Sequence, residues 1–228
     1  MKSEINCEIT VIILTLNEEF NISYCLNNVS GWAKEIIVLD SYSEDSTIPL
    51  AKSFGAKVFF RHFDNYANQR NYAVKELPIS NDWILFLDAD EWLTEELKQE
   101  ISEVIQNTHF DGFLIKRRLY FLGKWIRHGG NYPIWNLRLF RKGIAMVERE
   151  VNEHIKINGK IGRLKYDMVV ENRKGLTFWL HKHIGYARME AKQFNLSNGL
   201  TAKFWGNPIE RKSWIRNNIW NKISIPLI

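Results

Sequence analysis

Strand-like and helix-like patterns alternate four times in about the first 105 residues, and this alternation constrains the fold more than any other feature. The strand-like segments are apolar on both faces, as buried parallel strands are, and cover residues 9–14, 35–39, 57–60 and 83–87. Helical spacing of apolar residues follows each of them, over about residues 22–29, 46–54, 66–77 and 93–105. Four such units predict an α/β fold, a doubly wound and mostly parallel sheet flanked by helices.

The pattern changes near Gly112. Residues 112–115 and 137–140 are strand-like, and a loop rich in Gly, Trp and Tyr (120–135) joins them. A loop this long within one domain is typically functional or mobile. After about residue 176 the chain is helical, and Asn207-Pro208 is a typical helix start. We expect an α/β half (1–110), the rest of the same domain (111–176) and a helical C-terminal region (177–228).

The C-terminal region is basic. Residues 172–228 hold ten Lys and Arg against two acids, together with four of the nine tryptophans. Basic residues mixed with Trp predict an anionic membrane surface as a partner, and the alternative is a basic helical surface with buried Trp. Nucleic acid is not expected, because no recognised motif accompanies the charge.

Cellular location follows from three further sequence features. No apolar run reaches the roughly 20 residues that span a bilayer. The first residues do not resemble a signal peptide, and the two cysteines suit a reducing compartment. The sequence therefore predicts a cytoplasmic protein, peripheral on the inner face of the cell membrane.

Polar residues follow three of the predicted strands, at 15–18, 40–45 and 88–91. Ligands of doubly wound sheets bind beyond the carboxyl ends of the strands, so these residues are candidate site residues. Asp88 and Asp90 leave a buried strand one residue apart. Their hard oxygen ligands suit Mg²⁺ or Mn²⁺, which would neutralise the charge on a departing nucleoside diphosphate. The alternative is a solvated turn.

Three other residues are candidates for binding a nucleotide. Asp40 is an acceptor for the N3–H of uracil or the amide edge of guanine, whereas Ser43 or Asp45 is expected to cap the next helix. Glu18 is a candidate for the base or ribose, or else a favourable acid in a first helical turn. Arg70 is placed to reach the base or the phosphates, or else is an exposed helix arginine.

Two segments further along offer a base and additional metal ligands. An inverting transfer needs a group that takes the proton from the acceptor hydroxyl, and Glu153, with His154 in reserve, is the candidate. His181 and His183 would lie on one side of an extended segment, where either is able to complete a metal site.

Taken together, four motifs resemble the family 2 glycosyltransferases of the GT-A fold over about residues 8–180. They are Thr15-Leu-Asn-Glu-Glu, Val38-Leu-Asp-Ser-Tyr-Ser-Glu-Asp-Ser-Thr, Ala67-Asn-Gln-Arg-Asn and Leu87-Asp-Ala-Asp-Glu. Within that family, residues 119–130, 132–140 and 151–154 look like the lipopolysaccharide-core β-1,4-glucosyltransferase subgroup. Subgroup members tend to continue with an apolar, membrane-facing stretch, so the resemblance predicts further sequence beyond Ile228.

The resemblance implies residue roles and a reaction. Nucleotide binding falls to Glu18, Asp40, Arg70 and Asp88, with Thr15 and Asn17 of the first motif beside them, and Asp90 holds the metal. The implied reaction is inverting transfer of a hexose from a nucleotide-sugar, with UDP-sugar as donor, to a saccharide or lipid-linked saccharide of the cell envelope.

Two departures from the family pattern bear on these roles. Leu16 stands where many relatives have a base-stacking Tyr, and Asn152 stands where the subgroup has His. Two alternatives remain open. Nucleotidyltransferases share this sheet topology but carry a basic, Gly-rich first loop. A non-catalytic nucleotide-sugar-binding module is the other.

Overall fold

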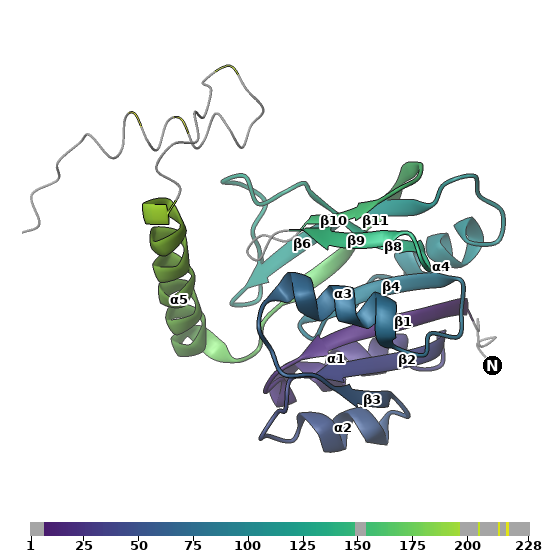
Figure 1. The fold of residues 1–228 in the computed structure, drawn as a ribbon, viewed down its shortest axis with the longest axis horizontal. Helices are drawn as coiled ribbons and strands as arrows, with labels where there is room; N and C mark the ends of the chain where they lie inside the picture. Colours follow the sequence, from purple (N-terminus) through teal and green to yellow (C-terminus); the bar gives the residue numbers. More distant parts are fainter. Residues whose placement is uncertain (1–6, 149–153, 197–204, 206–213, 215–217, 219–228) are drawn as a thin grey trace, which may run out of the picture. The chain divides into compact units, whose positions relative to one another are not determined.

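The computed structural model describes residues 7–148 and 154–196 and the single residues 205, 214 and 218 (Figure 1). Three β–α units come first: β1 (Cys7–Thr15) and α1 (Glu19–Val29), β2 (Ala33–Asp40) and α2 (Thr47–Ser53), β3 (Lys57–Phe60) and α3 (Tyr66–Glu76). In the fourth, a short β5 (Glu91–Leu93) separates β4 (Trp83–Asp88) from α4 (Glu95–Val104). The sequence predicts these four units, with ends that differ by a few residues, but it does not predict β5.

The second half is richer in strands than the sequence pattern indicates. It contains β6 (Gly112–Phe121), β7 (Lys124–Trp125), β8 (Ile134–Arg141), β9 (Ala145–Glu148), β10 (His154–Ile157) and β11 (Ile161–Glu171). The pattern predicts only the first four residues of β6 and residues 137–140 of β8. The segment 120–135, expected to be a loop, includes the end of β6 and all of β7.

The main sheet of the described residues has nine strands in the order β3-β2-β1-β4-β8-β6-β11-β5, with β7 paired to β6. Strands β3, β2, β1 and β4 are mutually parallel, and β8 lies antiparallel between β4 and β6. Strand β11 is parallel to β6 and antiparallel to β5. The predicted fold class, an α/β sheet that is mostly parallel and flanked by helices, is confirmed.

Both faces of the sheet are covered, because the apolar strands send successive side chains to opposite sides. Ile9, Val11 and Ile13 of β1 pack in one buried cluster with residues of α1 and α4. Ile12 packs in the second cluster with residues of α3 and of the β9–β10 pair. The central strands are therefore fixed on both faces, and their carboxyl ends are held in a constant register.

Helix termini agree with the local sequence. Thr94 accepts a hydrogen bond from the Leu97 amide at the start of α4, as an N-cap residue does. Gly55 has φ +77° just beyond α2, the left-handed conformation that commonly ends a helix.

The chain divides into two compact units, residues 1–175 and 176–228. Apart from isolated residues, the second unit is described only as far as the end of α5 (Gly175–Leu196). The helix expected to begin at Asn207 lies outside the described residues. In the part of the chain that the structure describes, no helix is both long enough and apolar enough to cross a membrane.

Candidate functional site

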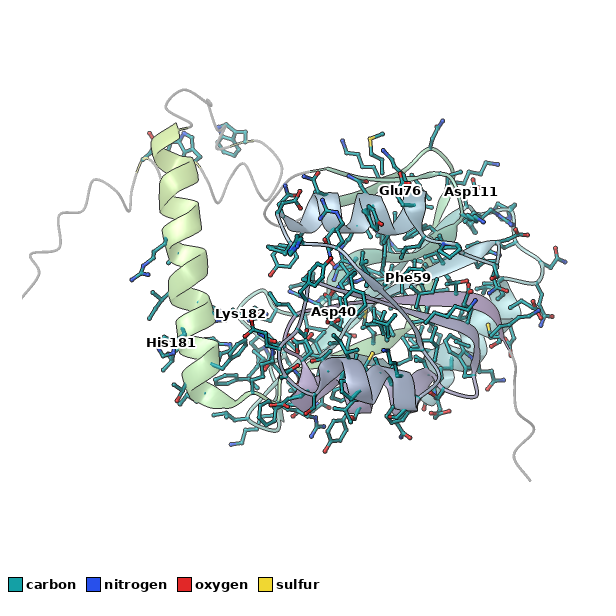
Figure 2. The ribbon with its side chains drawn as sticks, turned by 60° about the horizontal axis from the view of Figure 1, so that its bottom comes forward. Asp40, Phe59, Glu76, Asp111, His181 and Lys182 are labelled. Carbon is teal, nitrogen blue, oxygen red and sulfur yellow. The ribbon has the colours of Figure 1, made fainter. Side chains whose placement is uncertain are left out.

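The carboxyl ends of three neighbouring strands bring the predicted residues together. Leu14 of β1 pairs with Leu39 on one side and with Asp88 on the other, and Thr15 pairs with Asp40. Thr15, Asp40 and Asp88 thus end adjacent strands at one edge of the sheet. Figure 2 labels Asp40 at this edge and Asp111, which precedes β6, toward the opposite end.

Asp40 is fully buried and accepts three hydrogen bonds. The Thr15 hydroxyl donates to Oδ2 at 2.7 Å, and Ser43 donates from its hydroxyl to Oδ2 and from its amide to Oδ1, each at 2.6 Å. The carboxylate thereby closes the loop after β2. Ser43 does not cap α2, whose N-cap residue is Ser46, but the Asp45 carboxylate accepts the amide of Thr47, the first residue of α2, at 3.0 Å.

The loops after β1 and β2 are tied together by Asn17. Its amide donates to the Ser43 hydroxyl at 2.7 Å, and its side-chain oxygen accepts from the Glu44 amide at 2.9 Å. Asn17 has φ +54°, a conformation that Asn tolerates better than most residues. The two polar loops therefore form one connected rim above the strand ends.

Asp88 is clamped by two arginines. Arg70 of α3 donates to Oδ1 at 2.7 Å, and Arg138 of β8 donates to Oδ2 at 2.8 Å. The same Arg138 nitrogen bonds the buried Glu91 at 2.7 Å, and Glu91 accepts the Asp88 amide at 2.8 Å. Arg70 is only 2% exposed, which contradicts the alternative that it is an exposed helix arginine.

Burial and the two arginines act in opposite directions on these acids. Burial favours a neutral Asp88, but the guanidinium groups of Arg138 and Arg70 hold its pKa well below the usual range. Burial raises the pKa of Glu91, and the neighbouring Asp88 and Asp90 raise it further. Arg138 therefore links one firmly ionised carboxylate to one that is harder to ionise.

A segment that sequence reasoning missed completes the edge. Asn172, just past β11, donates to the Asp90 carboxylate at 3.2 Å, and the Glu171 amide donates to the Asp90 carbonyl at 3.0 Å. Lys174 donates to Glu18 at 2.6 Å. Burial nevertheless raises the pKa of Glu18. Had β11 been predicted, the carboxyl-end rule would have marked 172–174.

Asp88 and Asp90 differ in their surroundings. Both carboxylate oxygens of Asp88 accept arginine hydrogen bonds, and Asp90, half-buried at the same edge, accepts the Asn172 side-chain amide. Carboxylate oxygens are the hard ligands that Mg²⁺ and Mn²⁺ prefer, and the metal role of Asp90 stays a prediction. Among the described residues no group of three His, Cys, Asp or Glu side chains is arranged to hold a metal ion.

The predicted histidines lie on a helix rather than an extended segment. His181 and His183 belong to α5, where residues two apart point about 200° away from each other, so the expectation that both share one side is wrong. Their Nδ1 atoms lie 2.9 and 2.8 Å from the carbonyl oxygens of Thr177 and Trp179. Their metal role stays a prediction.

The base candidates are not placed by the structure. Glu153 lies outside the described residues, and His154 is the first residue of β10, without a described side chain. Their catalytic role also stays a prediction.

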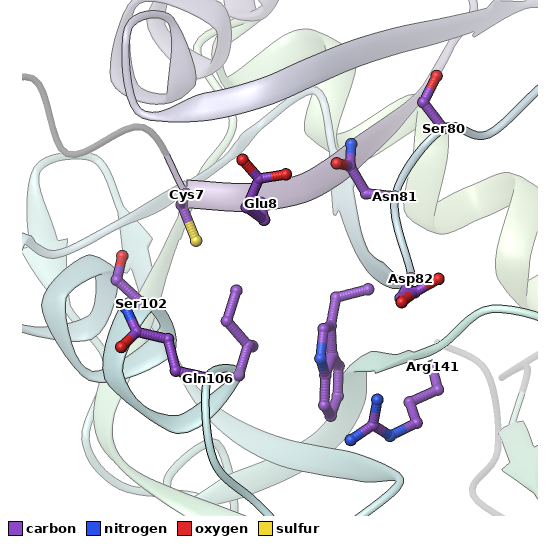
Figure 3. Close-up of a pocket in the computed structure, with 10 residues that line it drawn as sticks. Cys7, Glu8, Ser80, Asn81, Asp82, Ser102, Gln106 and Arg141 are labelled. Carbon is purple, nitrogen blue, oxygen red and sulfur yellow. The ribbon is translucent and has the colours of Figure 1, made fainter.

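A cavity of about 410 Å³ opens at the other end of the sheet (Figure 3). It is lined by the amino ends of β1 and β4, with Cys7 and Trp83, and by Arg141 at the end of the antiparallel β8. None of the predicted site residues lines it. The carboxyl-end rim, rather than this cavity, is the candidate site.

Residues 10–167 match the family model described as glycosyl transferase family 2. The chain belongs to this family. It is 38% identical over 148 residues to an uncharacterized glycosyltransferase of Rickettsia typhi, which covers 64% of the chain and 50% of that relative. It is 36% identical over 104 residues to the SPbeta prophage-derived glycosyltransferase SunS of Bacillus subtilis, and this match covers 45% of the chain and 24% of SunS.

A solved structure supports the GT-A fold. The crystal structure of S. aureus TarS 1-349, in complex with UDP-GlcNAc, superposes with a TM-score of 0.54 at 18% identity, covering 74% of this chain and 59% of that one. The chain spans about half, or less, of the length of the curated relatives it matches.

Proposed function

We propose that this family 2 chain is an inverting hexosyltransferase that uses a nucleotide-sugar donor, with UDP-sugar as the expected donor. The acceptor is a saccharide or lipid-linked saccharide of a cell-envelope glycan, such as lipopolysaccharide core or capsule. The observation that carries the proposal is the meeting of Thr15, Asp40, Asp88 and Asp90 at the carboxyl edge of β1, β2 and β4.

The rim suits a nucleotide. Ser43 supplies two of the three hydrogen bonds to Asp40, so a base edge that binds Asp40 would replace bonds from a loop serine rather than disrupt the core. Arg70 fixes the Asp88 carboxylate, which leaves Asp88 oriented toward the ribose or a shared water. Lys174, beside Glu18, brings positive charge to the same edge for the phosphates.

Asp90 is the residue proposed to hold Mg²⁺ or Mn²⁺. The cation would supply neutralisation of the charge that develops on the leaving diphosphate. Asn172 holds the Asp90 carboxylate through its side-chain amide, and the Glu171 amide fixes the Asp90 backbone. His181 and His183 remain candidates for a further ligand.

Glu153 is the proposed base, with His154 in reserve. A base removes the acceptor proton without contacting the nucleotide, so Glu153→Gln should keep donor affinity and lower turnover by about 10²–10⁴-fold. His154→Gln is the matched variant, because it changes the neighbouring candidate alone. If Glu153→Gln turns over normally and His154→Gln does not, the base is His154.

The C-terminal region is proposed to attach the protein to the inner face of the membrane. Its excess of Lys and Arg, mixed with Trp, matches an anionic headgroup surface. Binding to vesicles that contain phosphatidylglycerol should weaken as salt rises, because exposed charges are screened within about 8–10 Å. Equal binding to neutral phosphatidylcholine vesicles would show that the charge of the headgroups does not contribute to membrane attachment.

Donor binding is tested by thermal shift with UDP-, GDP- and dTDP-sugars in the presence of Mn²⁺. A bound ligand stabilises the folded state by mass action, and UDP-sugar should give the largest metal-dependent shift. Asp90→Asn should abolish that dependence, whereas Asp82→Asn, an exposed acid at the opposite end of β4, should not. Binding without turnover or donor hydrolysis would favour the non-catalytic module, and nucleotidyl products would favour the other alternative.

A further inference from the structure

A row of cations and tryptophans crosses one face of β8, β6, β7 and β11. It lies partly in the segments 119–130 and 132–140 that resemble the subgroup, but the four donor-site motifs do not include it. The basic–aromatic row, as it is called below, consists of Arg127, Trp125, Arg118, Lys116, Trp135 and Arg163. It includes three residues of the Gly- and Trp-rich segment 120–135, namely Trp125, Arg127 and Trp135.

Trp125 holds one end of the row. The guanidinium carbon of Arg127 lies 4.2 Å from the Trp125 ring centroid, and that of Arg118 lies 5.0 Å from it. A guanidinium stacked on a ring keeps its N–H donors available in the plane for an anion. The Trp125 indole nitrogen is buried and makes no hydrogen bond with any described residue.

Trp135 holds the other end. Lys116 and Trp135 are direct partners in the antiparallel β6–β8 pair, and the Lys116 ammonium lies 5.4 Å from the ring centroid. The Arg163 guanidinium carbon lies 5.1 Å from the same ring. No carboxylate of the described residues forms an ion pair with Arg163 or Arg127, although both are exposed.

One buried acid joins the two ends. Asp167 contacts Lys116 at 3.1 Å and Arg118 at 2.7 Å, and its carboxylate also accepts the Tyr132 hydroxyl at 3.1 Å. Lys116 and Arg118 pair with Asp167, whereas Arg127 and Arg163 form no ion pair with a described carboxylate, so the row carries an excess of positive charge. Because Lys116 and Arg118 are 19% and 33% exposed, they are recessed, which suits a small ligand better than a flat lipid surface.

The register places this row beside the candidate donor site. Leu85 of β4 and Phe113 of β6 both pair with Leu139, and β4 and β6 run in the same direction. Asp88 and Lys116 each lie three residues further along, on the carboxyl side of that shared level, although the β4–β8 pairing ends at Leu85 and the β6–β8 register shifts by one residue after Phe113. They are two strands apart, on the order of 10 Å where strands stay paired. One acceptor longer than a single sugar can contact both places.

We propose that the basic–aromatic row binds the phosphate or carboxylate group of an acidic saccharide acceptor and positions that acceptor for transfer. The proposal rests on the proposed function, because an acceptor presupposes a donor. It adds the substrate class: an anionic rather than a neutral saccharide. Arg127 and Arg163 contribute the unpaired guanidinium groups, while Asp167 orients Arg118 and Lys116.

The test uses the full chain and two probes, cellobiose and cellobiouronic acid, which differ in one carboxylate. Binding is followed through the indole N–H resonances of Trp125 and Trp135, assigned with Trp→Phe variants. The acidic disaccharide should bind at least about tenfold more tightly than cellobiose and should weaken as salt rises, since a charge-assisted hydrogen bond is worth about that factor. Equal affinities would overturn the proposal.

Arg127→Gln/Arg163→Gln should lower affinity for the acidic disaccharide about tenfold and leave cellobiose unchanged. The matched control, Lys52→Gln/Lys75→Gln, removes two exposed cations from α2 and α3 and the same net charge. An equal loss in the control would contradict a specific site. A response of the same resonances to phosphatidylglycerol vesicles but not to the disaccharide would assign the row to a membrane.

The experiments distinguish a failure of the proposed transferase function from a failure of the proposed acceptor site. Thermal shift with UDP-glucose and Mn²⁺ measures the donor site without the row, and the Arg127→Gln/Arg163→Gln variant should give the wild-type shift. Loss of donor binding with intact discrimination of the disaccharides would refute the transferase, and the row would then bind an acidic saccharide that is no acceptor. Intact donor binding without discrimination would refute the row alone.

Discussion

Removal of Arg138 should destabilise the fold by an amount that its contacts define. Its Nη2 atom joins Asp88 at 2.8 Å and Glu91 at 2.7 Å, and the Glu91 side chain is only 1% exposed. Breaking a buried ion pair by deleting one partner costs about 3–5 kcal/mol. In Arg138→Met, Asp88 keeps its ion pair with Arg70, and Glu91 can take up a proton. The loss of unfolding free energy should therefore lie near the lower end of that range, about 3 kcal/mol.

The assay is urea unfolding, supported by the melting temperature. For a chain of this size about 1 kcal/mol corresponds to roughly 2–4 °C, so Arg138→Met should melt about 6–12 °C lower. Arg141→Met is the matched control on the same strand. Arg141 is 38% exposed and lies 3.9 Å from Asp111, a surface pair worth at most about 1 kcal/mol.

A second variant separates charge from packing. Arg138→Met leaves the buried Glu91 without its arginine partner. Adding Glu91→Gln removes that uncompensated acid, so the double variant should regain at least about half of the stability that Arg138→Met loses. The reasoning is refuted if Arg138→Met costs no more than Arg141→Met, or if the double variant is the sum of its parts.

Two further predictions concern other buried charges. Glu35 accepts hydrogen bonds from Thr10, Lys57 and Ser80, which lower its pKa to about 2 despite burial, so stability should fall as pH drops from about 4.5 toward 2. Glu35→Gln should lower the free energy of unfolding by about 3 kcal/mol at pH 7. The variant should also lose most of the fall in stability between pH 4.5 and 2, measured by urea unfolding at each pH, and a fall equal to that of the wild type would refute the assignment. Lys174→Met should weaken nucleotide-sugar affinity about tenfold in calorimetry, whereas unaltered affinity would exclude phosphate contact.

The first half of the fold was predictable because its local and global signals agree. Residues 9–14 and 83–87 are apolar runs between turn signals, and each is followed by a helical stripe. Two of the missed strands carry weaker signals. Strand β5 has three residues, too few to show a period. Strand β11 does alternate from Gly162 to Met168, but the glycine near its start and the apolar run Met168-Val169-Val170 at its end interrupt the period on both sides.

The site was predictable as far as the carboxyl-end rule reaches. It placed Asp40, Asp88 and Asp90 at one edge, but the partners of Asp88 depend on which strand lies beside β4. Arg138 is 50 residues away and arrives only because β8 inserts antiparallel there. Contacts of this range depend on strand order, which no local pattern in this chain specifies. His181 and His183 were misplaced because alternation and helical spacing cannot be separated over three residues.

The most direct test of the central claim is release of UDP from a UDP-sugar by the full chain with and without Mn²⁺. The account predicts metal-dependent release that chelation by EDTA abolishes, that Asp90→Asn lowers by at least about a hundredfold, and that Asp82→Asn leaves at the wild-type rate. Release by Asp90→Asn in EDTA at the rate of the wild type with Mn²⁺ would contradict the account, because the carboxyl-end rim would then not be where the donor is bound and activated.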